Sequence, residues 1–249
     1  MDQFFGLEFS GSPFQLFGPG HLIALAVIAL INLSFIFWRK TATFAQRKAF
    51  RYTLAAILLI DEAAWHAWNA VTGQWSIQTT LPLHICSVFV FLSAYMLITK
   101  NYRIYEFAYF LGIAGALQAL LTPDAGKYGF PHFRAFQVMI SHGAIVTAAV
   151  YMTVMEGFRP TWRSLGKTIL WGNVYMIGVG ILNALIGSNY LFIARKPDTA
   201  SLLDVLGPWP LYLLSLQVIG LVLFLLLYLP FAVKDWKARK RSAVTTTAV

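Results

Sequence analysis

The fold of this chain is decided by the stretch Leu81-Pro82-Leu83-His84-Ile85-Cys86, which opens an apolar run that reaches Ile98. Pro82 has no backbone N–H and its φ angle already suits a helix, so it predicts the first helical turn. An apolar run of about twenty residues is long enough to cross a bilayer as a helix. His84 and Cys86 lie two and four residues after Pro82, so at about 1.5 Å per residue we expect both near the outer membrane surface.

The composition indicates a membrane protein. Hydrophobic residues make up 58% of the 249 residues and charged residues 12%, with a mean hydropathy of +0.65. One soluble core cannot cover that much apolar surface. Helices satisfy their own backbone groups in lipid, and the alternating pattern of a membrane barrel is absent. The apolar runs of spanning length are residues 20–38, 50–70, 81–99, 104–121, 134–155, 167–187 and 209–233.

The sequence therefore predicts an all-α, polytopic bundle of seven transmembrane helices. We expect residues 1–19 to form an outer interfacial segment, 20–233 the transmembrane domain and 234–249 a basic cytoplasmic tail. Of the 19 Lys and Arg residues, the four outside the predicted cytoplasmic side are Lys127, Arg134, Arg195 and Lys196. The positive-inside rule then places the N-terminus outside and the C-terminus in the cytoplasm of a cell-membrane protein.

The net charge of +9 needs no nucleic-acid partner, because topology accounts for it. A basic segment beside the membrane attracts anionic lipid of the inner leaflet, so we expect the tail to contact such lipid. The single cysteine excludes an intramolecular disulfide. Sequence motifs for metal, nucleotide or dinucleotide binding are absent, so we expect no metal and no cofactor.

The second predicted helix carries two adjacent acidic residues, Asp61 and Glu62, near its middle. Each costs about 2.5–3.5 kcal/mol at the bilayer centre on insertion scales, so both must find partners. Glu62, His66 and Asn69 share one helix face by their spacing, and Arg51 is about three turns away, too far to neutralise either acid. Two interpretations stay open: a hydrogen-bonded brace between helices, and a polar pocket or proton relay.

Further polar residues fall in the outer half of the predicted bundle, where ionisable groups mark functional sites. His142 lies eight residues beyond Arg134, at about the depth of Glu62. We expect an outward-facing cavity beside the candidate catalytic residues His84, Cys86 and His142. Its predicted lining residues are Asp61, Glu62, His66, Asn69, Gln118, Asp124 and Asn183.

Several strings together resemble the YwaF-type bacterial integral membrane protein family over nearly the whole chain. They are residues 81–86, 115–124, Ser141-His142-Gly143, Asn189-Tyr190 and residues 201–210. That family is similar to eukaryotic multi-pass acyltransferases that remodel ether phospholipids. The resemblance implies that His84 and His142 correspond to the acyltransferase histidines. Where that pattern has a nucleophilic cysteine between Pro and His, this chain has Leu83.

Two functions are consistent with these observations. The first is a lipid-active acyltransferase or hydrolase, with membrane lipids as its partners. In it His142 is a general base, His84 a second acid/base or oxyanion-stabilising group, and Cys86 a nucleophile. The second is a transporter or ligand sensor in which Asp61, Glu62, His66 and His142 bind a proton or a small polar solute. A packing role for Cys86 also stays open, since cysteine often behaves as a small hydrophobe.

Overall fold

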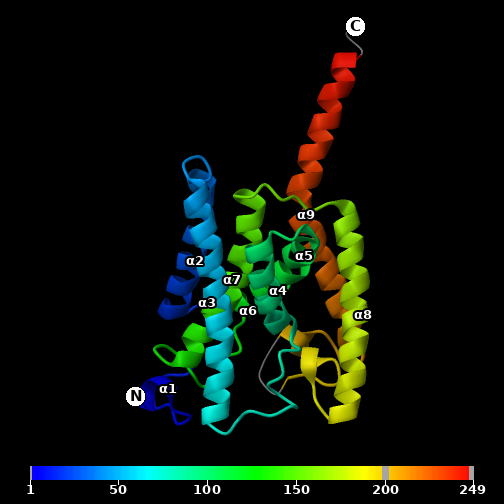
Figure 1. The fold of residues 1–249 in the computed structure, drawn as a ribbon. Helices are drawn as coiled ribbons and strands as arrows, with labels where there is room; N and C mark the ends of the chain where they lie inside the picture. The colour runs from blue at the N-terminus through cyan, green and yellow to red at the C-terminus, as the bar shows by residue number, and fades with distance from the viewer. Residues whose placement is uncertain (1, 198–201, 247–249) are drawn as a thin grey trace.

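The computed structural model describes residues 2–197 and 202–246. Helices make up 72% of the structure, and the described ranges contain no strand. Figure 1 shows the long helices side by side in a bundle. The long elements are α2 (Pro19–Trp38), α3 (Phe44–Val71), α4 (Ile85–Thr99), α7 (Phe133–Val154), α8 (Trp162–Ile186) and α9 (Leu211–Thr246). Between α4 and α7, α5 (Tyr102–Phe107), the π-helical turn η1 (Ala108–Gly112) and α6 (Ile113–Leu121) follow one another without a break.

The all-helical prediction is confirmed, and a helix occupies each of the seven predicted runs. Of these, α2, the segment 102–121, α7, α8 and α9 are long and apolar enough to cross a membrane in the described ranges. α4 is apolar but has only 15 residues. The number of spans and their orientation stay predictions. Short elements complete the chain: α1 (Asp2–Phe5), η2 (Tyr190–Phe192) and η3 (Leu202–Val205).

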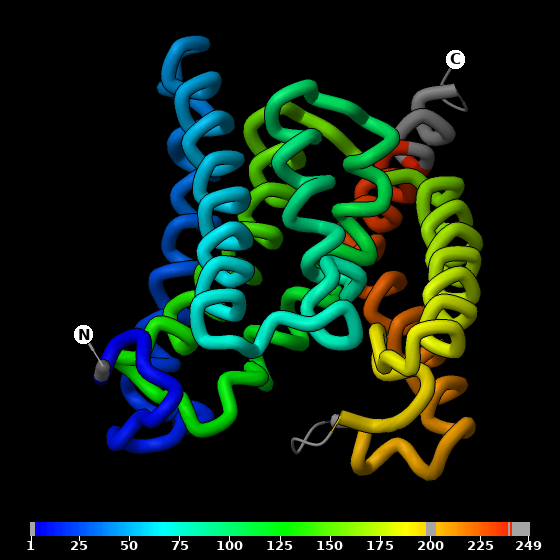
Figure 2. Tube along the Cα trace, turned by 60° about the horizontal axis from the view of Figure 1, so that its bottom comes forward, coloured from blue at the N-terminus to red at the C-terminus, as the bar shows by residue number. Residues whose placement is uncertain are grey.

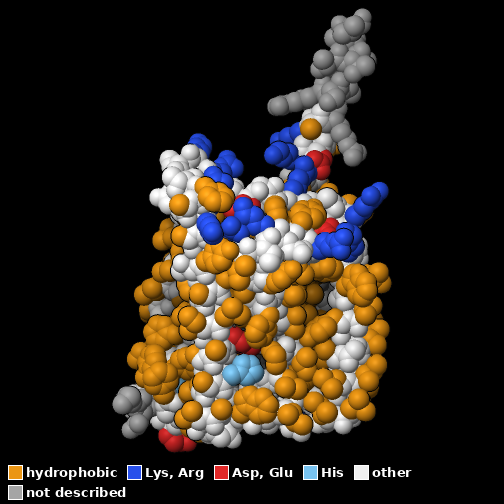
Figure 3. Space-filling model, in the orientation of Figure 1, with side chains coloured by type: hydrophobic (Ala, Val, Ile, Leu, Met, Phe, Trp, Pro, Cys, Tyr) orange, Lys and Arg blue, Asp and Glu red, His pale blue; other side chains and the backbone are white. Residues whose placement is uncertain are grey.

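The centre of the bundle is formed by α3, α4, α7 and the segment 102–121, while α2, α8 and α9 lie outside it. In α7, 78% of the apolar window is buried, compared with 11% in α2 and α8 and 6% in α9. Helices that are apolar all round but exposed in the protein are suited to contact lipid. Figure 3 shows the resulting belt of apolar side chains, with Lys and Arg gathered beyond one end of it.

That basic end holds ion pairs which tie the helix ends together. Glu156 pairs with Arg51 at 3.6 Å and with Lys100 at 2.5 Å. Arg159 pairs with Asp235 on α9. Arg51 therefore pairs with Glu156 at the basic end of the bundle and not with Asp61 or Glu62, as expected from its distance along α3.

The start of α4 differs from the sequence prediction. The helix begins at Ile85 rather than at residue 81, and Arg51 Nη1 at the basic end of α3 donates to the Leu97 carbonyl at 2.7 Å. Glu62 lies eleven residues beyond Arg51, and Cys86 lies eleven residues before Leu97, so both are about 16 Å from this contact. His84 and Cys86 therefore lie level with Glu62 along the bundle, and their depth below the outer membrane surface stays a prediction.

The connection between α3 and α4 reaches this depth because its backbone finds partners inside the protein. Tyr190 Oη accepts from Leu81 N at 2.8 Å and donates to the Ile77 carbonyl at 2.8 Å. Tyr175 Oη, in the middle of α8, donates to the Leu83 carbonyl at 2.7 Å. Irregular backbone is tolerated at membrane depth only where protein or water satisfies it. Figure 2 shows this connection beside the loops that follow α6 and α8.

Three other helices extend beyond the predicted runs: α3 and α8 begin six and five residues earlier, and α9 ends later. α9 continues past residue 233 to Thr246, so residues 234–246 of the predicted tail prolong the last helix. Residues 247–249 of that tail lie outside the described residues. At the other terminus, residues 6–18 pack over the end of the bundle away from the basic residues. The carbonyl of Gly6 faces His132 Nε2 at 3.0 Å, and that of Phe5 accepts from Trp68 Nε1 at 2.7 Å.

Candidate functional site

The acid pair of α3 faces a row of polar residues on α7. Asp61 and Glu62 are buried, and Gln137 Nε2 donates to Asp61 Oδ2 at 3.0 Å. Ser141 also lies at the Asp61 carboxylate. Arg134, Gln137 and Ser141 are spaced i, i+3 and i+7, which places them on one helix face. Part of the partner set that the acids require is therefore supplied by α7.

Arg134 provides the compensating charge, and the sequence analysis missed this role. Its guanidinium lies 4.1 Å from the centre of the Trp65 ring and acts electrostatically on both Asp61 and Glu62. It also donates to Gln137 Oε1, and to the Asp124 carbonyl at 3.0 Å. From the sequence alone, Arg134 was predicted only as one of the four outer cations. The signal that would have found it is the i, i+3, i+7 spacing from Arg134 to Ser141.

Glu62 forms the second half of the cluster, together with His66. Glu62 Oε1 lies 3.6 Å from His66 Nε2, as their i, i+4 spacing predicts. Trp75 Nε1 donates to His66 Nδ1 at 3.2 Å, which leaves the ring proton on Nε2, directed toward Glu62. The Glu62 side chain is 5% exposed and that of His66 27%. Figure 3 shows acidic and histidine side chains adjoining within the apolar belt.

Two residues at the start of α4 complete this cluster. Ser87 lies close enough to the Glu62 carboxylate for a hydrogen bond, and Cys86 is within its electrostatic influence. Among the described residues, Glu62 Oε1 has no hydrogen-bond donor although it is buried. A buried carboxylate oxygen without a donor is costly, and such groups concentrate at functional sites. We call Asp61, Glu62, His66, Cys86, Ser87 and Arg134 the acid–thiol cluster.

His84 faces a different environment from Cys86. Leu191 N donates to its Nδ1 at 3.4 Å, and its ring lies 5.3 Å from that of Tyr190 and 5.1 Å from that of Phe192. The carboxylate of Asp124 acts electrostatically on His84. His84 also lines a cavity of about 260 Å³ formed with the loop that follows α8. The two predicted catalytic residues of this stretch therefore point to separate surroundings.

His142 lies further along α7 than the residues that face the acid–thiol cluster. Its Nδ1 donates to the Val138 carbonyl at 2.6 Å, which leaves Nε2 as an acceptor. His142 is five residues beyond Gln137, the partner of Asp61, and therefore about 7 Å further along α7. In the described ranges, no hydrogen bond or ion pair joins His142 to the α3 acids, His84 or Cys86. Its predicted place in one cavity with Glu62 stays a prediction.

The remaining predicted lining residues have varied surroundings. Asn69 Nδ2 donates to the Trp65 carbonyl at 2.8 Å within its own helix. Asn183 donates to the Tyr190 carbonyl and accepts from Tyr190 N, each at 2.9 Å, and so holds the loop after α8. Asp124 is exposed and approaches the cluster through Arg134, while Gln118 lies in the last turn of α6. The acid–thiol cluster thus unites only Asp61, Glu62, His66 and Cys86 of the predicted set.

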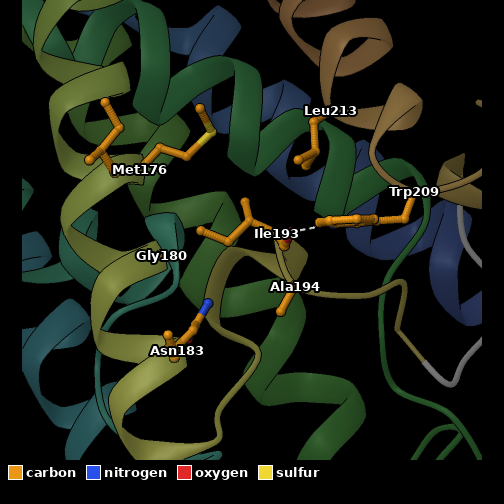
Figure 4. A pocket seen from close by; sticks show the side chains of 9 residues that line it. Met176, Gly180, Asn183, Ile193, Ala194, Trp209 and Leu213 are labelled. Atoms are coloured by element: carbon orange, nitrogen blue, oxygen red, sulfur yellow. Dashed lines mark hydrogen bonds between the residues drawn. The ribbon is translucent and has the colours of Figure 1, made fainter.

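A larger, apolar cavity of about 390 Å³ lies between α8, the loop after it and the start of α9. Met176, Gly180 and Leu213 form its walls, and Trp209 Nε1 donates to the Ile193 carbonyl at 3.0 Å across one end (Figure 4). Neither this cavity nor the smaller one contains the acid–thiol cluster. Across residues 2–197 and 202–246, no group of three or more His, Cys, Asp or Glu side chains is arranged to hold a metal ion.

Comparison with known proteins places these residues within one family. The model of the TMEM164 family matches residues 16–228, which is most of the chain. The matched span contains every residue of the acid–thiol cluster and both cavities. No curated protein and no solved structure matches the chain.

Proposed function

Since the chain belongs to the TMEM164 family, a family of membrane proteins, we propose that it is an enzyme acting on membrane lipids at the acid–thiol cluster. The proposal covers acyl transfer or ester hydrolysis, in the cell membrane, with the cluster on the outer half. We also propose that the chain is related to the YwaF-type proteins and, through them, to the ether-phospholipid acyltransferases. The charge asymmetry of the two ends supports the orientation.

One observation carries the proposal: the irregular connection before α4 holds the Cys86 thiol within electrostatic influence of the buried Glu62 carboxylate. Cys86 lies level with Glu62, whose Oε1 lacks a donor among the described residues. Packing alone does not require a non-helical segment at this depth, because its backbone must then be satisfied by specific partners such as Tyr175 and Tyr190. A lipid-derived acyl group is the reactant that such a depth favours.

The arrangement supports covalent acyl transfer through Cys86. Glu62 accepts the proton of the Cys86 thiol, and the thiolate adds to the carbonyl carbon of a lipid ester. The alkoxide leaves with that proton, and a thioester remains on Cys86. A hydroxyl of a second lipid, or water, then attacks the thioester and restores the thiol. His66 Nε2–H lies 3.6 Å from Glu62 Oε1 and favours its charged form, and His142 Nε2 is a second candidate base.

Comparative lipidomics of cells with and without the protein tests this function. We expect Cys86→Ala and Glu62→Gln to abolish the difference in lipid composition, because one removes the nucleophile and the other its base. Glu8→Gln is the matched control, since the Glu8 side chain is 99% exposed and lies on the same predicted outer side. Ser87→Ala tests the neighbouring hydroxyl as a rival nucleophile. Identical lipid profiles with and without the unmutated protein would contradict an enzymatic role.

The acid pair also favours a second candidate function. Arg134, Gln137 and Asp61 form a buried polar network that can change protonation, as a transporter or sensor for a proton or small polar solute requires. In that case Asp61→Asn abolishes a solute- or pH-dependent change in thermal stability, and lipid composition is the same with and without the protein. A lipid change that depends on Cys86 would exclude this candidate as the main function.

A further inference from the structure

We propose that the smaller cavity is a phosphate-binding pocket in which His84, Arg195 and Lys196 hold the headgroup phosphate of a phospholipid. This inference rests on the proposed function, because it names the substrate class of the same enzyme. It assigns His84 to binding rather than to acid/base chemistry.

The pocket lies between two loops that fold back into the bundle. It has a volume of about 260 Å³, many times the ~10–15 Å³ that one water needs on this measure, and therefore has room for a phosphate group with its attached glycerol. One wall carries Thr79 and His84, and the other runs from Gly187 to Pro197. Asn189 fixes the second wall, since its Oδ1 accepts from Arg195 N at 3.1 Å and its Nδ2 donates to the Arg195 carbonyl at 2.9 Å.

Two cationic side chains, Arg195 and Lys196, line the pocket. Arg195 and Lys196 are two of the four Lys and Arg residues on the predicted outer side, where such residues are disfavoured. Within residues 2–197 and 202–246, no carboxylate lies within ion-pair distance of either one. Lys196 Nζ instead donates to the Asp204 carbonyl at 3.4 Å and lies 5.9 Å from the centre of the Tyr212 ring. The other two outer cations have carboxylates nearby, Glu8 for Lys127 and Asp61 for Arg134.

The donors around the pocket suit a phosphate. His84 Nδ1 accepts from Leu191 N, so the neutral ring carries its proton on Nε2 and can donate from there. The planar guanidinium of Arg195 matches the geometry of phosphate oxygens, and the Lys196 ammonium adds a second charge. Hydrogen bonds between such cations and phosphate are roughly twice as strong as neutral ones.

The neighbouring apolar cavity favours a lipid over free phosphate as the source of this group. Ile193 and Ala194 line the apolar cavity, and the next two residues, Arg195 and Lys196, line the phosphate pocket. Consecutive residues of one loop thus offer an apolar and a cationic surface, as an amphiphile requires. His84 is two residues from Cys86, so a headgroup held there keeps its lipid beside the acid–thiol cluster.

Binding measurements on the full-length protein in detergent test the pocket. The probes are dihexanoylphosphatidylglycerol, inorganic phosphate and uncharged dihexanoylglycerol, and Cys86→Ala is the background that suppresses turnover through the thiol. We expect Arg195→Gln and Lys196→Gln each to weaken binding of the phospholipid about tenfold or more, because each removes a charge-assisted hydrogen bond. The control Lys127→Gln removes an outer cation that is not in the pocket and should leave the affinity unchanged.

Each outcome decides the proposal. Weaker phospholipid binding in the two pocket variants, with dihexanoylglycerol unaffected, supports a phosphate site. Equal affinities in Arg195→Gln, Lys196→Gln and Lys127→Gln would overturn it. If inorganic phosphate binds as tightly as the phospholipid, the lipid is not the ligand. If inorganic phosphate competes only weakly with the phospholipid, the site binds a lipid headgroup. Pocket-dependent binding without any lipid turnover by the unmutated protein would contradict the enzymatic function and leave the binding site intact.

Discussion

Replacement of Arg134 by glutamine should destabilise the protein far more than removal of a surface arginine. Arg134 is the cation that compensates Asp61 and Glu62, and its guanidinium stacks on Trp65 at 4.1 Å. Removing one partner of a buried charged network leaves the other charges without compensation, which costs about 3–5 kcal/mol. The lost stacking accounts for about 0.5–2 kcal/mol of that loss.

The same reasoning predicts a coupling between Arg134 and Asp61. In an Asp61→Asn background one carboxylate fewer is left uncompensated, so the cost of Arg134→Gln should fall by about 0.5–3 kcal/mol. Denaturant unfolding in detergent micelles, followed by tryptophan fluorescence, measures both values. Arg103→Gln is the matched control, because Arg103 is exposed, and surface substitutions usually stay within about 0.5 kcal/mol. An Arg134→Gln loss equal to that of the control, or unchanged by Asp61→Asn, would refute the compensating role.

Three further predictions concern orientation, loop stability and pH. Topology reporters fused after Lys240 should score cytoplasmic and those within residues 190–200 external; an external C-terminus would reverse the orientation. Asn183→Ala should destabilise by about 1–3 kcal/mol, because it strips the Tyr190 backbone of two hydrogen bonds; no change on thermal unfolding would contradict the brace. Burial lowers the pKa of His132 below its ordinary value of 6.5, so the unfolded chain binds more protons. Stability should therefore be full above about pH 6.5 and fall as the pH drops through the folded-state pKa, and the loss should shrink in His132→Asn.

Much of the fold could be predicted because helices in lipid leave a direct signature in the sequence. Apolar runs of spanning length gave seven helix positions, and most of their ends agree with the structure within a few residues. α3 and α8 begin six and five residues earlier than predicted, α4 begins four residues later, and α9 ends later. The start of α4 was missed for a physical reason. Pro82 is compatible with both a first helical turn and an irregular segment. The irregular segment is stabilised by the hydroxyls of Tyr175 and Tyr190, which are far away in the sequence.

The candidate site was predicted only in part. The acid pair and its i, i+4 partner His66 followed from helix periodicity, and the structure places them as expected. Cys86 joins them because the folded connection brings it level with Glu62, which periodicity within one helix does not reveal. Arg134 was missed because charge counting assigns an arginine near a helix end to the surface, although its long side chain reaches inward.

The most direct test of the account is the intact mass of the purified protein after incubation with a short-chain phospholipid ester. The account predicts a mass increase of one acyl group on Cys86, absent in Cys86→Ala and formed about 10²–10⁴-fold more slowly in Glu62→Gln, as expected for loss of a general base. Lipid turnover that proceeds without any adduct and persists in Cys86→Ala would contradict it.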